Sequence, residues 1–311
     1  MSRLPLLLSL ALAVLPGPAC VTSPPAPAVP AEAAAPVEHA FLWEVQGAQG
    51  GTVYVVGSIH LARAGELTLS PSMDAAFQRS DALVVEVDVG AVDSSKMQQV
   101  ILKQGLLPGD QTLWQRLDPE TAKLLAAAAE RAGLPMVGLE RMRPWVVAIT
   151  LSVLELQRGG YEPGLGVDRL FLDRARGSKQ IVELETAEEQ LLLLALLPEP
   201  LQEQMLRDQL RRSGQSEGVL ERITAAWKAG DAEGLAAQVF QQEQEDPGLR
   251  PLYEKLFYER NARMAEKVGA MLAQPRTWFV VVGAGHVVGP EGLLALLQKQ
   301  GHRVRQLPKA P

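Results

Sequence analysis

The sequence predicts an α/β fold with a mixed, largely parallel sheet that is flanked by helices and carries a large helical insertion. Dense runs of β-branched and aromatic residues alternate with helical segments, which is typical of strands buried on both faces. Two of these runs, TVYVVGSIH and TWFVVVGAGH, repeat one pattern: a strand stops at a glycine, and a histidine follows three residues later. Between about residues 187 and 273, by contrast, helical patterning is nearly continuous.

The first elements form a hairpin followed by a helix and a third strand. Residues 41–45 and 52–56 are strand-like and are joined by GAQGG, whose glycines supply the turn. Ser70 and Pro71 provide an N-cap and a proline at the first helical position of a short helix. The run ALVVEV at 82–87 then predicts the next strand.

The remaining elements follow from the same patterns. Helices are expected to end at Gly133, Gly177 and Gly301, because glycine adopts the left-handed conformation of a helix C-terminus at little cost. The expected helices are 119–132, 145–157, 167–176, 251–273 and 291–300. The expected strands are 136–140 (MVGLE), 181–185 (IVELE), 277–282 and 302–307.

Residues 1–20 predict an export signal. Arg3 precedes an apolar run that is too short to span a bilayer, and small residues lead to Cys20. Cys20 is the only cysteine and falls where a bacterial lipobox would place it, although Gly17 stands where that motif usually has leucine. We expect a lipid anchor at Cys20. The alternative is a plain secretory signal that is cut nearby, with Cys20 removed or incidental.

Residues 21–37 (VTSPPAPAVPAEAAAPV) predict an extended tether, because proline and alanine at this density build no packed core. The folded domain is expected to span 38–311, in the cell envelope or periplasm and held at the outer membrane if the anchor forms. It has no cysteine, so neither disulfides nor thiolate metal ligands stabilise it. The net charge of −6 and the lack of a long basic run argue against nucleic acid as a partner.

Two of the four histidines, His60 and His286, occupy matched positions after the repeated strands. The glycine before each permits a sharp turn, and the C-terminal edge of such a sheet is where open α/β folds keep their sites. Two imidazoles need a third ligand to form a catalytic metal site with an open position. Glu86 is the first candidate, because a carboxylate between apolar residues must be paired or bound to a cation. Glu185, at the end of IVELE, is the second, unless it only caps the following helix.

A metal ion held by His60, His286 and Glu86 would lower the pKa of a bound water and polarise a carbonyl group. Whichever of Glu86 and Glu185 is not a ligand would then serve as a general base in catalysis. Arg260 is expected either to bind a substrate carboxylate or oxyanion, or to form a surface ion pair.

Four further residues are expected to be structural. Asp168 and Asp173 are expected on a solvated helix face beside Arg169 and Arg174, and the other two histidines are expected to be surface residues, His39 and His302.

Several blocks together resemble the TraB/GumN family, whose relatives include the Tiki proteins. The resemblance runs from about residue 40 to 308. The blocks are GSIH, VVEVD, GVDRLFLDRARGSKQIVELETAEEQ, the RN pair at 260–261 and VVGAGHVVGPEGLLALLQKQGHRV. The resemblance implies a fold related to erythromycin esterase and to the haem-binding lipoprotein ChaN. It also implies metal-dependent proteolysis that relies on the two GxxH histidines and an acidic residue.

Two functions remain open. The first is an exported metal-dependent hydrolase acting on a peptide or protein, with zinc, manganese and cobalt not distinguished. The second is a non-catalytic lipoprotein of the ChaN type that holds haem or a metal ion; an esterase that uses a general base without metal is a lesser option. The sequence contains no HExxH, GxSxG, P-loop or GxGxxG motif, which argues against zincins, serine hydrolases and nucleotide-binding proteins.

Overall fold

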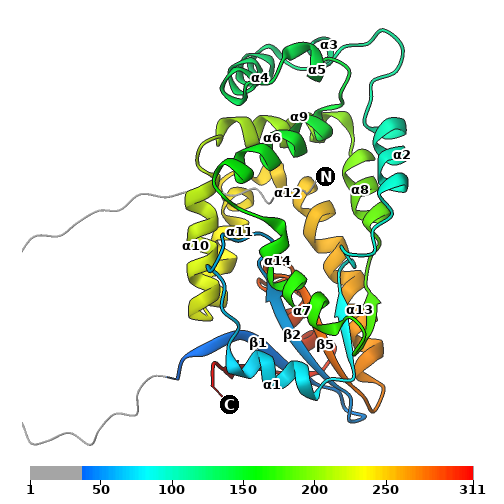
Figure 1. The fold of residues 1–311 in the computed structure, drawn as a ribbon, viewed down its shortest axis with the longest axis vertical. Coiled ribbons are helices and arrows are strands. Elements are labelled where there is room, and N and C mark those ends of the chain that lie inside the picture. Colours follow the sequence, from blue (N-terminus) through cyan, green and yellow to red (C-terminus); the bar gives the residue numbers. More distant parts are fainter. Residues whose placement is uncertain (1–36, 311) are drawn as a thin grey trace, which may run out of the picture.

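A six-stranded mixed sheet lies at one end of the computed structural model, which describes residues 37–310 (Figure 1). The strand order is β4-β3-β5-β2-β1-β6. The first four strands in this order run parallel, and β1 is antiparallel to both of its neighbours. This confirms the expected fold class. The strands are β1 (His39–Gln46), β2 (Thr52–Ser58), β3 (Ala82–Val85), β4 (Gln180–Glu183), β5 (Thr277–Gly283) and β6 (Arg303–Pro308).

Helices occupy most of the chain between the strands. Before β4 they are α1 (Pro71–Arg79), α2 (Ser94–Gln104), α3 (Leu113–Arg116), α4 (Pro119–Ala132), α5 (Met136–Leu139), α6 (Pro144–Arg158), the 3-10 helix η1 (Pro163–Leu165) and α7 (Val167–Ala175). After β4 they are α8 (Ala187–Ala195), α9 (Glu199–Arg211), α10 (Ser216–Ala229), α11 (Ala232–Glu245), η2 (Pro247–Leu249), α12 (Arg250–Tyr253), the π-helix η3 (Glu254–Tyr258) and α13 (Glu259–Leu272). Two short helices, α14 (Ala284–Val287) and α15 (Leu293–Lys299), follow β5.

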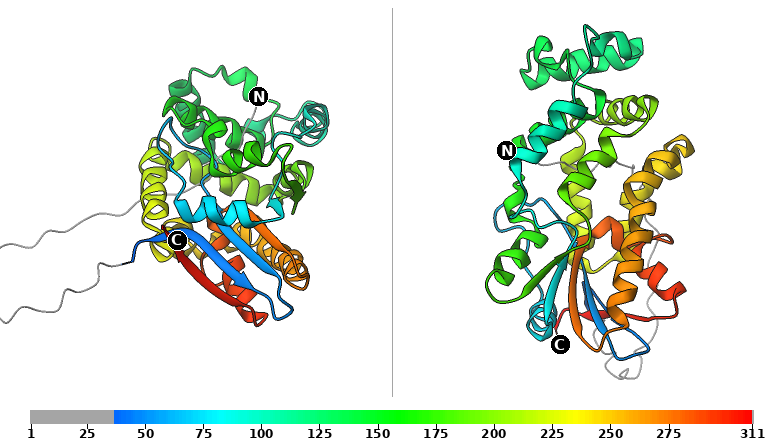
Figure 2. Two further views of the ribbon diagram at one scale, coloured as in Figure 1. Left: turned by 60° about the horizontal axis from the view of Figure 1, so that its bottom comes forward. Right: turned by 90° about the vertical axis from the view of Figure 1, so that its right-hand side faces the viewer.

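Helices cover both faces of the sheet, which is why its central strands are apolar throughout. Helices α1 and α7 pack on one face, and α13 and α15 lie on the other (Figure 2). On the first face Phe279 of β5 meets Phe77 of α1 and Phe171 of α7, with ring centroids 5.4 and 4.6 Å away. Burial of such apolar surface is the main force that holds helix and sheet together.

The predominantly helical part of the chain extends beyond the C-terminal ends of the parallel strands (Figure 1). Helices α8 to α13 span the region that was expected to be a helical insertion. Helix α14 starts at the end of β5 and contacts β2. The sheet edge that was expected to carry the site therefore faces the helical part of the molecule.

Some boundaries differ from the expectation. The segment MVGLE forms helix α5 and not a strand, and its Val137 is 75% exposed, so it packs against no neighbouring strand. Strands β3 and β4 end before Glu86 and Glu185, which leaves both residues in the segments that follow. The single helix expected from residue 251 is interrupted by the π-helix η3, and helix α2 was not expected.

Three predictions about the N-terminus lie outside the described residues: the export signal, the lipid anchor at Cys20 and nearly all of the tether. Within residues 37–310, no helix has both the length and the apolar character needed to cross a bilayer.

Candidate active site

The candidate residues follow the four parallel strands and lie at one edge of the sheet. His60 follows β2, Glu86 follows β3, Glu185 follows β4, and His286 lies in α14 directly after β5. The register aligns these ends: Ser58 of β2 pairs with Gly283 of β5. The backbone N–H of Glu185 donates to the carbonyl of Glu86 at 2.8 Å.

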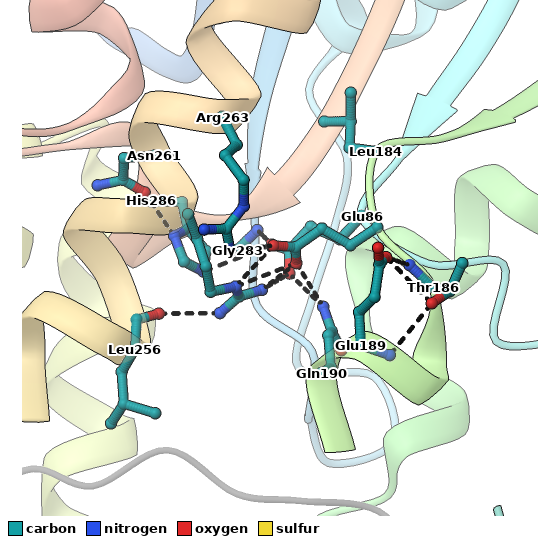
Figure 3. A network of polar contacts seen from close by, with 12 residues as sticks. Glu86, Leu184, Thr186, Glu189, Gln190, Leu256, Asn261, Arg263, Gly283 and His286 are labelled. Carbon is teal, nitrogen blue, oxygen red and sulfur yellow. Dashed lines mark hydrogen bonds and ion pairs between the residues drawn. The ribbon is translucent and has the colours of Figure 1, made fainter. Parts of the chain in front are cut away.

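The carboxylate of Glu86 is the centre of the site (Figure 3). Its Oε1 accepts a hydrogen bond from the backbone N–H of Gly283. The same oxygen lies 3.9 Å from Nε2 of His60 and 4.0 Å from Nε2 of His286. Burial raises the pKa of Glu86, but His286, Arg260 and His60 outweigh it and bring the pKa down to about 2. Glu86 is therefore ionised at neutral pH.

Arg260 of α13 ties Glu86 to Glu185. Its Nη2 lies 2.9 Å from Oε2 of Glu86 and 2.7 Å from Oε2 of Glu185, and its Nη1 donates to the carbonyl of Leu256 at 2.9 Å. Gln190 of α8 donates to both carboxylates, at 3.2 and 3.0 Å. The Arg260 side chain is only 12% exposed, so the expected surface ion pair is in fact a buried one. Such a network satisfies buried charges and fixes the orientation of Glu86.

The ring of His286 is held by Asn261 of α13 (Figure 3). Nδ1 of His286 lies 2.6 Å from Oδ1 of Asn261, while Nδ2 of Asn261 donates to the carbonyl of Glu291 at 2.8 Å. Because that second bond assigns the amide orientation, Oδ1 must accept, and Nδ1 carries the proton. Burial, followed by the charge of Arg260, lowers the pKa of His286 to about 3. The neutral ring therefore turns an unprotonated Nε2 toward Glu86.

The ring of His60 is held in the same manner by Asp168 of α7. Nδ1 of His60 lies 3.2 Å from Oδ1 of Asp168, and the same oxygen accepts from the hydroxyl of Ser58 at 2.8 Å. Burial lowers the pKa of His60, but the charges of Asp168 and Glu86 outweigh it and raise the pKa to about 9. In the absence of a bound cation, His60 is therefore protonated at neutral pH.

The prediction that Asp168 lies on a solvated helix face is wrong. Its side chain is 14% exposed and belongs to the site, because Gly166 lets the start of α7 approach the backbone of His60. A Cβ atom on Gly166 would lie 2.6 Å from the carbonyl oxygen of His60. Asp173 behaves as expected and pairs with Arg169 on the surface at 3.0 Å.

Neither glycine of the GxxH pattern, Gly57 or Gly283, has a positive φ, so neither makes a left-handed turn. Their role is to let neighbouring side chains come close to the backbone. A Cβ on Gly283 would lie 2.7 Å from Nε2 of His60 and 3.2 Å from Oε1 of Glu86. A Cβ on Gly57 would lie 2.5 Å from the ring of Phe41. The missing side chain of Gly283 thus preserves the space between His60 and Glu86.

The donor set at this space fits a divalent ion. Two neutral imidazole nitrogens and one carboxylate oxygen are the ligands of many catalytic zinc sites. With ligand bonds of about 2.1 Å in tetrahedral geometry, N and O ligands lie roughly 3.4 Å apart, so each histidine would have to move toward Glu86 by roughly half an ångström. As they stand, no three His, Cys, Asp or Glu side chains within residues 37–310 are arranged to hold a metal ion.

A cavity of about 260 Å³ opens beside these side chains and extends among the helices. His60, Glu86, Arg260 and His286 contribute to its wall, whereas Glu185 does not. Most of the remaining wall is apolar and comes from helices α8 to α12 and η3, with side chains that include Leu194, Leu220, Ile223, Leu235, Val239 and Leu256.

The structure brings together His60, His286, Glu86 and Arg260, and it places Glu185 behind Arg260. Glu185 does not cap the next helix, because Thr186 and Glu189 form that capping box. The sequence reasoning missed Asp168, Asn261 and Gln190. Two sequence features could have indicated the first two. Asn261 belongs to the RN pair, and Asp168 is the second residue of a helix that follows Gly166.

A family model of the TraB/PrgY/gumN family matches residues 41–306, which is nearly the whole of the described chain. The chain belongs to the TraB/PrgY/gumN family.

Similarity to individual proteins is modest. The chain is 25% identical over 249 residues to the uncharacterized protein YbaP of Escherichia coli (strain K12), covering 79% of this chain and 87% of YbaP. It is 26% identical over 320 residues to Metalloprotease TIKI1 of Danio rerio, covering 87% of this chain and 63% of that protein. Metalloprotease TIKI2 of the same organism is 27% identical over 329 residues, with shares of 87% and 61%. No solved structure matches the chain.

Proposed function

We propose that this protein is a metal-dependent hydrolase, specifically a peptidase, whose ion is held by His60, His286 and Glu86. One observation supports the proposal above all. The Nε2 atoms of both histidines lie within 4.0 Å of the same Glu86 oxygen, while their Nδ1 atoms contact side-chain oxygens of Asp168 and Asn261. Metal-binding histidines typically donate their second nitrogen to a carboxylate or carbonyl oxygen in this way. The similarity to two proteins named as metalloproteases supports the same reaction class.

When bound, a divalent ion supplies a water of lowered pKa and polarises the carbonyl of the bond to be cleaved. Side chains around the proposed ligands hold them in position for the ion. Asp168 and Asn261 hold the two rings, and Arg260 holds the carboxylate of Glu86. Arg260 and Glu185 thus act as positioning residues, because Glu185 contacts Arg260 and no contact joins it to either histidine among the described residues.

Haem is a poorer fit than a small ion. An axial histidine needs open space beyond its Nε2 for the macrocycle. Here a carboxylate oxygen that is bound to Gly283 occupies that direction, 3.9 and 4.0 Å from the two histidines. The general-base esterase without metal also has less support, because burial and Arg260 lower the pKa of His286 to about 3 and make it a weak base.

The test is metal analysis of protein purified without chelators, followed by peptide hydrolysis with and without added zinc, manganese or cobalt. We expect about one ion per chain and hydrolysis that a chelator abolishes and the ion restores. Haem absorbance without hydrolysis would instead support the ChaN-like carrier. Hydrolysis that survives complete removal of metal would support the esterase mechanism.

We also propose that the protein is exported and held at a membrane through Cys20, on the evidence of its first 37 residues alone. Cell fractionation should find the wild-type protein in the membrane fraction of the envelope. The Cys20→Ala variant should appear in the soluble periplasmic fraction. Retention of the wild-type protein in the cytoplasm would contradict this proposal.

A further inference from the structure

The cavity beside the site carries a second group of polar side chains that the chemistry at His60 and His286 does not use. Asp208 of α9, Gln242 of α11 and Tyr253 of α12 all contribute to its wall. Of the three, Tyr253 is separated from His286 by the ring of Phe257. Phe257 packs on His286 with ring centroids 5.2 Å apart, and Tyr253 stacks on Phe257 at 5.6 Å.

Two members of this group are buried and incompletely bonded. Asp208 is 8% exposed and Gln242 is 2% exposed. Oδ2 of Asp208 and Nε2 of Gln242 are both buried atoms without a hydrogen-bond partner in the structure. Buried polar groups are normally paired, and an unpaired one costs about 1–3 kcal/mol of folding stability. Burial also raises the pKa of Asp208, and the charges of nearby arginines only partly offset it.

The two free atoms are complementary in chemistry. A carboxylate oxygen can only accept, and an amide nitrogen can only donate. A peptide amide offers the matching pair, since its N–H donates and its C=O accepts. Both atoms are enclosed in the structure, so a ligand in the cavity reaches them by rotation about the terminal torsions of the two side chains, which are soft.

Much of the remaining cavity wall is apolar, with side chains that include Leu220, Leu235, Val239 and Leu252. A cavity of about 260 Å³ is close to the lower end of the roughly 300–1,000 Å³ that is usual for ligand sites. It therefore accommodates a short segment and not a folded partner.

We propose that Asp208 and Gln242 form a substrate-binding subsite, which binds the amide on the C-terminal side of two consecutive apolar residues of a peptide whose side chains fill the cavity. This inference rests on the proposed peptidase function and names its substrate class: peptides with consecutive apolar residues at the bond that is cleaved. The polar atoms left unpaired in the folded protein become paired when such a peptide is bound.

The test measures binding and not hydrolysis, so that it remains valid if the metal proposal fails. The probes are N-acetyl-leucyl-leucinamide and the methyl ester of N-acetyl-leucyl-leucine, titrated calorimetrically into metal-free full-length protein. The ester keeps the apolar side chains and a carbonyl acceptor but loses the terminal N–H donors. We expect the amide to bind at least about tenfold more tightly than the ester, because a lost hydrogen bond leaves Asp208 unpaired. Equal binding of the two probes, or no binding of either, would overturn the subsite.

Variants separate a binding role from a structural one. Asp208→Leu and Gln242→Met should each weaken binding of the amide about tenfold while leaving the melting temperature unchanged or raised, because each removes an unsatisfied buried atom. Gln202→Met is the matched control. Gln202 is 1% exposed, does not contribute to the cavity wall, and donates to the carbonyl of Leu197 at 2.8 Å. Its Oε1 is also a buried atom without a partner, but Gln202→Met leaves the carbonyl of Leu197 without its donor, so this variant should lower the melting temperature and leave binding unchanged. Unchanged binding of the amide in both subsite variants would refute the assignment.

Discussion

In this structure Nδ1 of His286 lies 2.6 Å from Oδ1 of Asn261, a residue 25 positions earlier in the chain. The bond fixes the tautomer of the imidazole and leaves Nε2 free on the side of Glu86. His60 has the equivalent bond to Asp168, with a carboxylate in place of the amide. The two rings are therefore oriented from outside the site before any ion is present, which reduces the cost of binding one.

Loss of the Asn261 bond should weaken ion binding without removing a ligand. The variant Asn261→Leu frees the His286 ring to rotate, and loss of such an outer partner typically costs about 10–100-fold in metal affinity. The measurement is a zinc titration against a competing chelator. The variant His302→Ala, which changes a histidine between α15 and β6 that does not line the cavity, serves as the control and should bind zinc normally. Wild-type affinity in Asn261→Leu would show that the bond does not orient a ligand.

Zinc affinity should fall as the pH is lowered below about 9. The ion must displace the proton of His60, whose pKa is raised to about 9, whereas His286 and Glu86 are already unprotonated because their pKa values are lowered to about 3 and 2. One displaced proton corresponds to about tenfold weaker binding per pH unit between about pH 8 and pH 5.

The variant Asp168→Asn tests the cause of that pH dependence. It keeps an acceptor for Nδ1 but removes the charge that raises the pKa of His60, so the decline in zinc affinity should begin at a lower pH. Titrations at several pH values, with zinc and a competing chelator, measure both curves. Affinity that does not change with pH in the wild-type protein would contradict the role given to His60.

A methyl group at Gly283 should block the site while leaving the fold intact. The backbone there has φ −51°, which alanine adopts without strain, but the new Cβ would lie 2.7 Å from Nε2 of His60. We expect Gly283→Ala to lose bound metal and to melt within a few degrees of the wild type. The matched control is Gly164→Ala, where a Cβ would meet nothing within 4 Å. Full metal content in Gly283→Ala would contradict the position assigned to the ion.

Residues 1–37 should contribute nothing to the stability of the domain. A chain that begins at Glu38 should melt like the mature protein, because a segment rich in proline and alanine has little apolar surface to bury. Differential scanning calorimetry of the two proteins measures the difference. A drop of several degrees in the shorter protein would mean that the segment docks on the domain.

Strand patterning predicted the sheet edge and its main residues because that information is local. Each buried strand is a dense apolar run, and parallel strands must end at a common edge, so His60, Glu86, Glu185 and His286 could all be assigned to it. The failure at MVGLE has the same origin. Three apolar residues in a short segment suit a strand or a helix equally, and no strand within residues 37–310 lies beside them to accept their hydrogen bonds.

The partners of the histidines could not be predicted in this way. Asp168 and Asn261 reach the rings only because α7 and α13 pack against the ends of strands far from them in the chain. In sequence, Asp168 has the appearance of a residue on an exposed helix face next to Arg169. Its burial depends on Gly166, whose contact with the backbone of His60 is a tertiary feature. Local pattern alone carries no information of this kind.

His60, His286 and Glu86 are proposed to hold one catalytic ion, and bound metal measured beside peptide hydrolysis in matched variants tests this proposal most directly. His60→Ala, His286→Ala and the double variant should each lack both metal and activity, with the double variant scarcely worse than either single one, because the ligands act as one unit. Glu86→Gln should also lose activity, and its metal content decides whether Glu86 is a ligand or a general base. His302→Ala should retain metal and activity. Full metal content and full activity in either His60→Ala or His286→Ala would contradict the account.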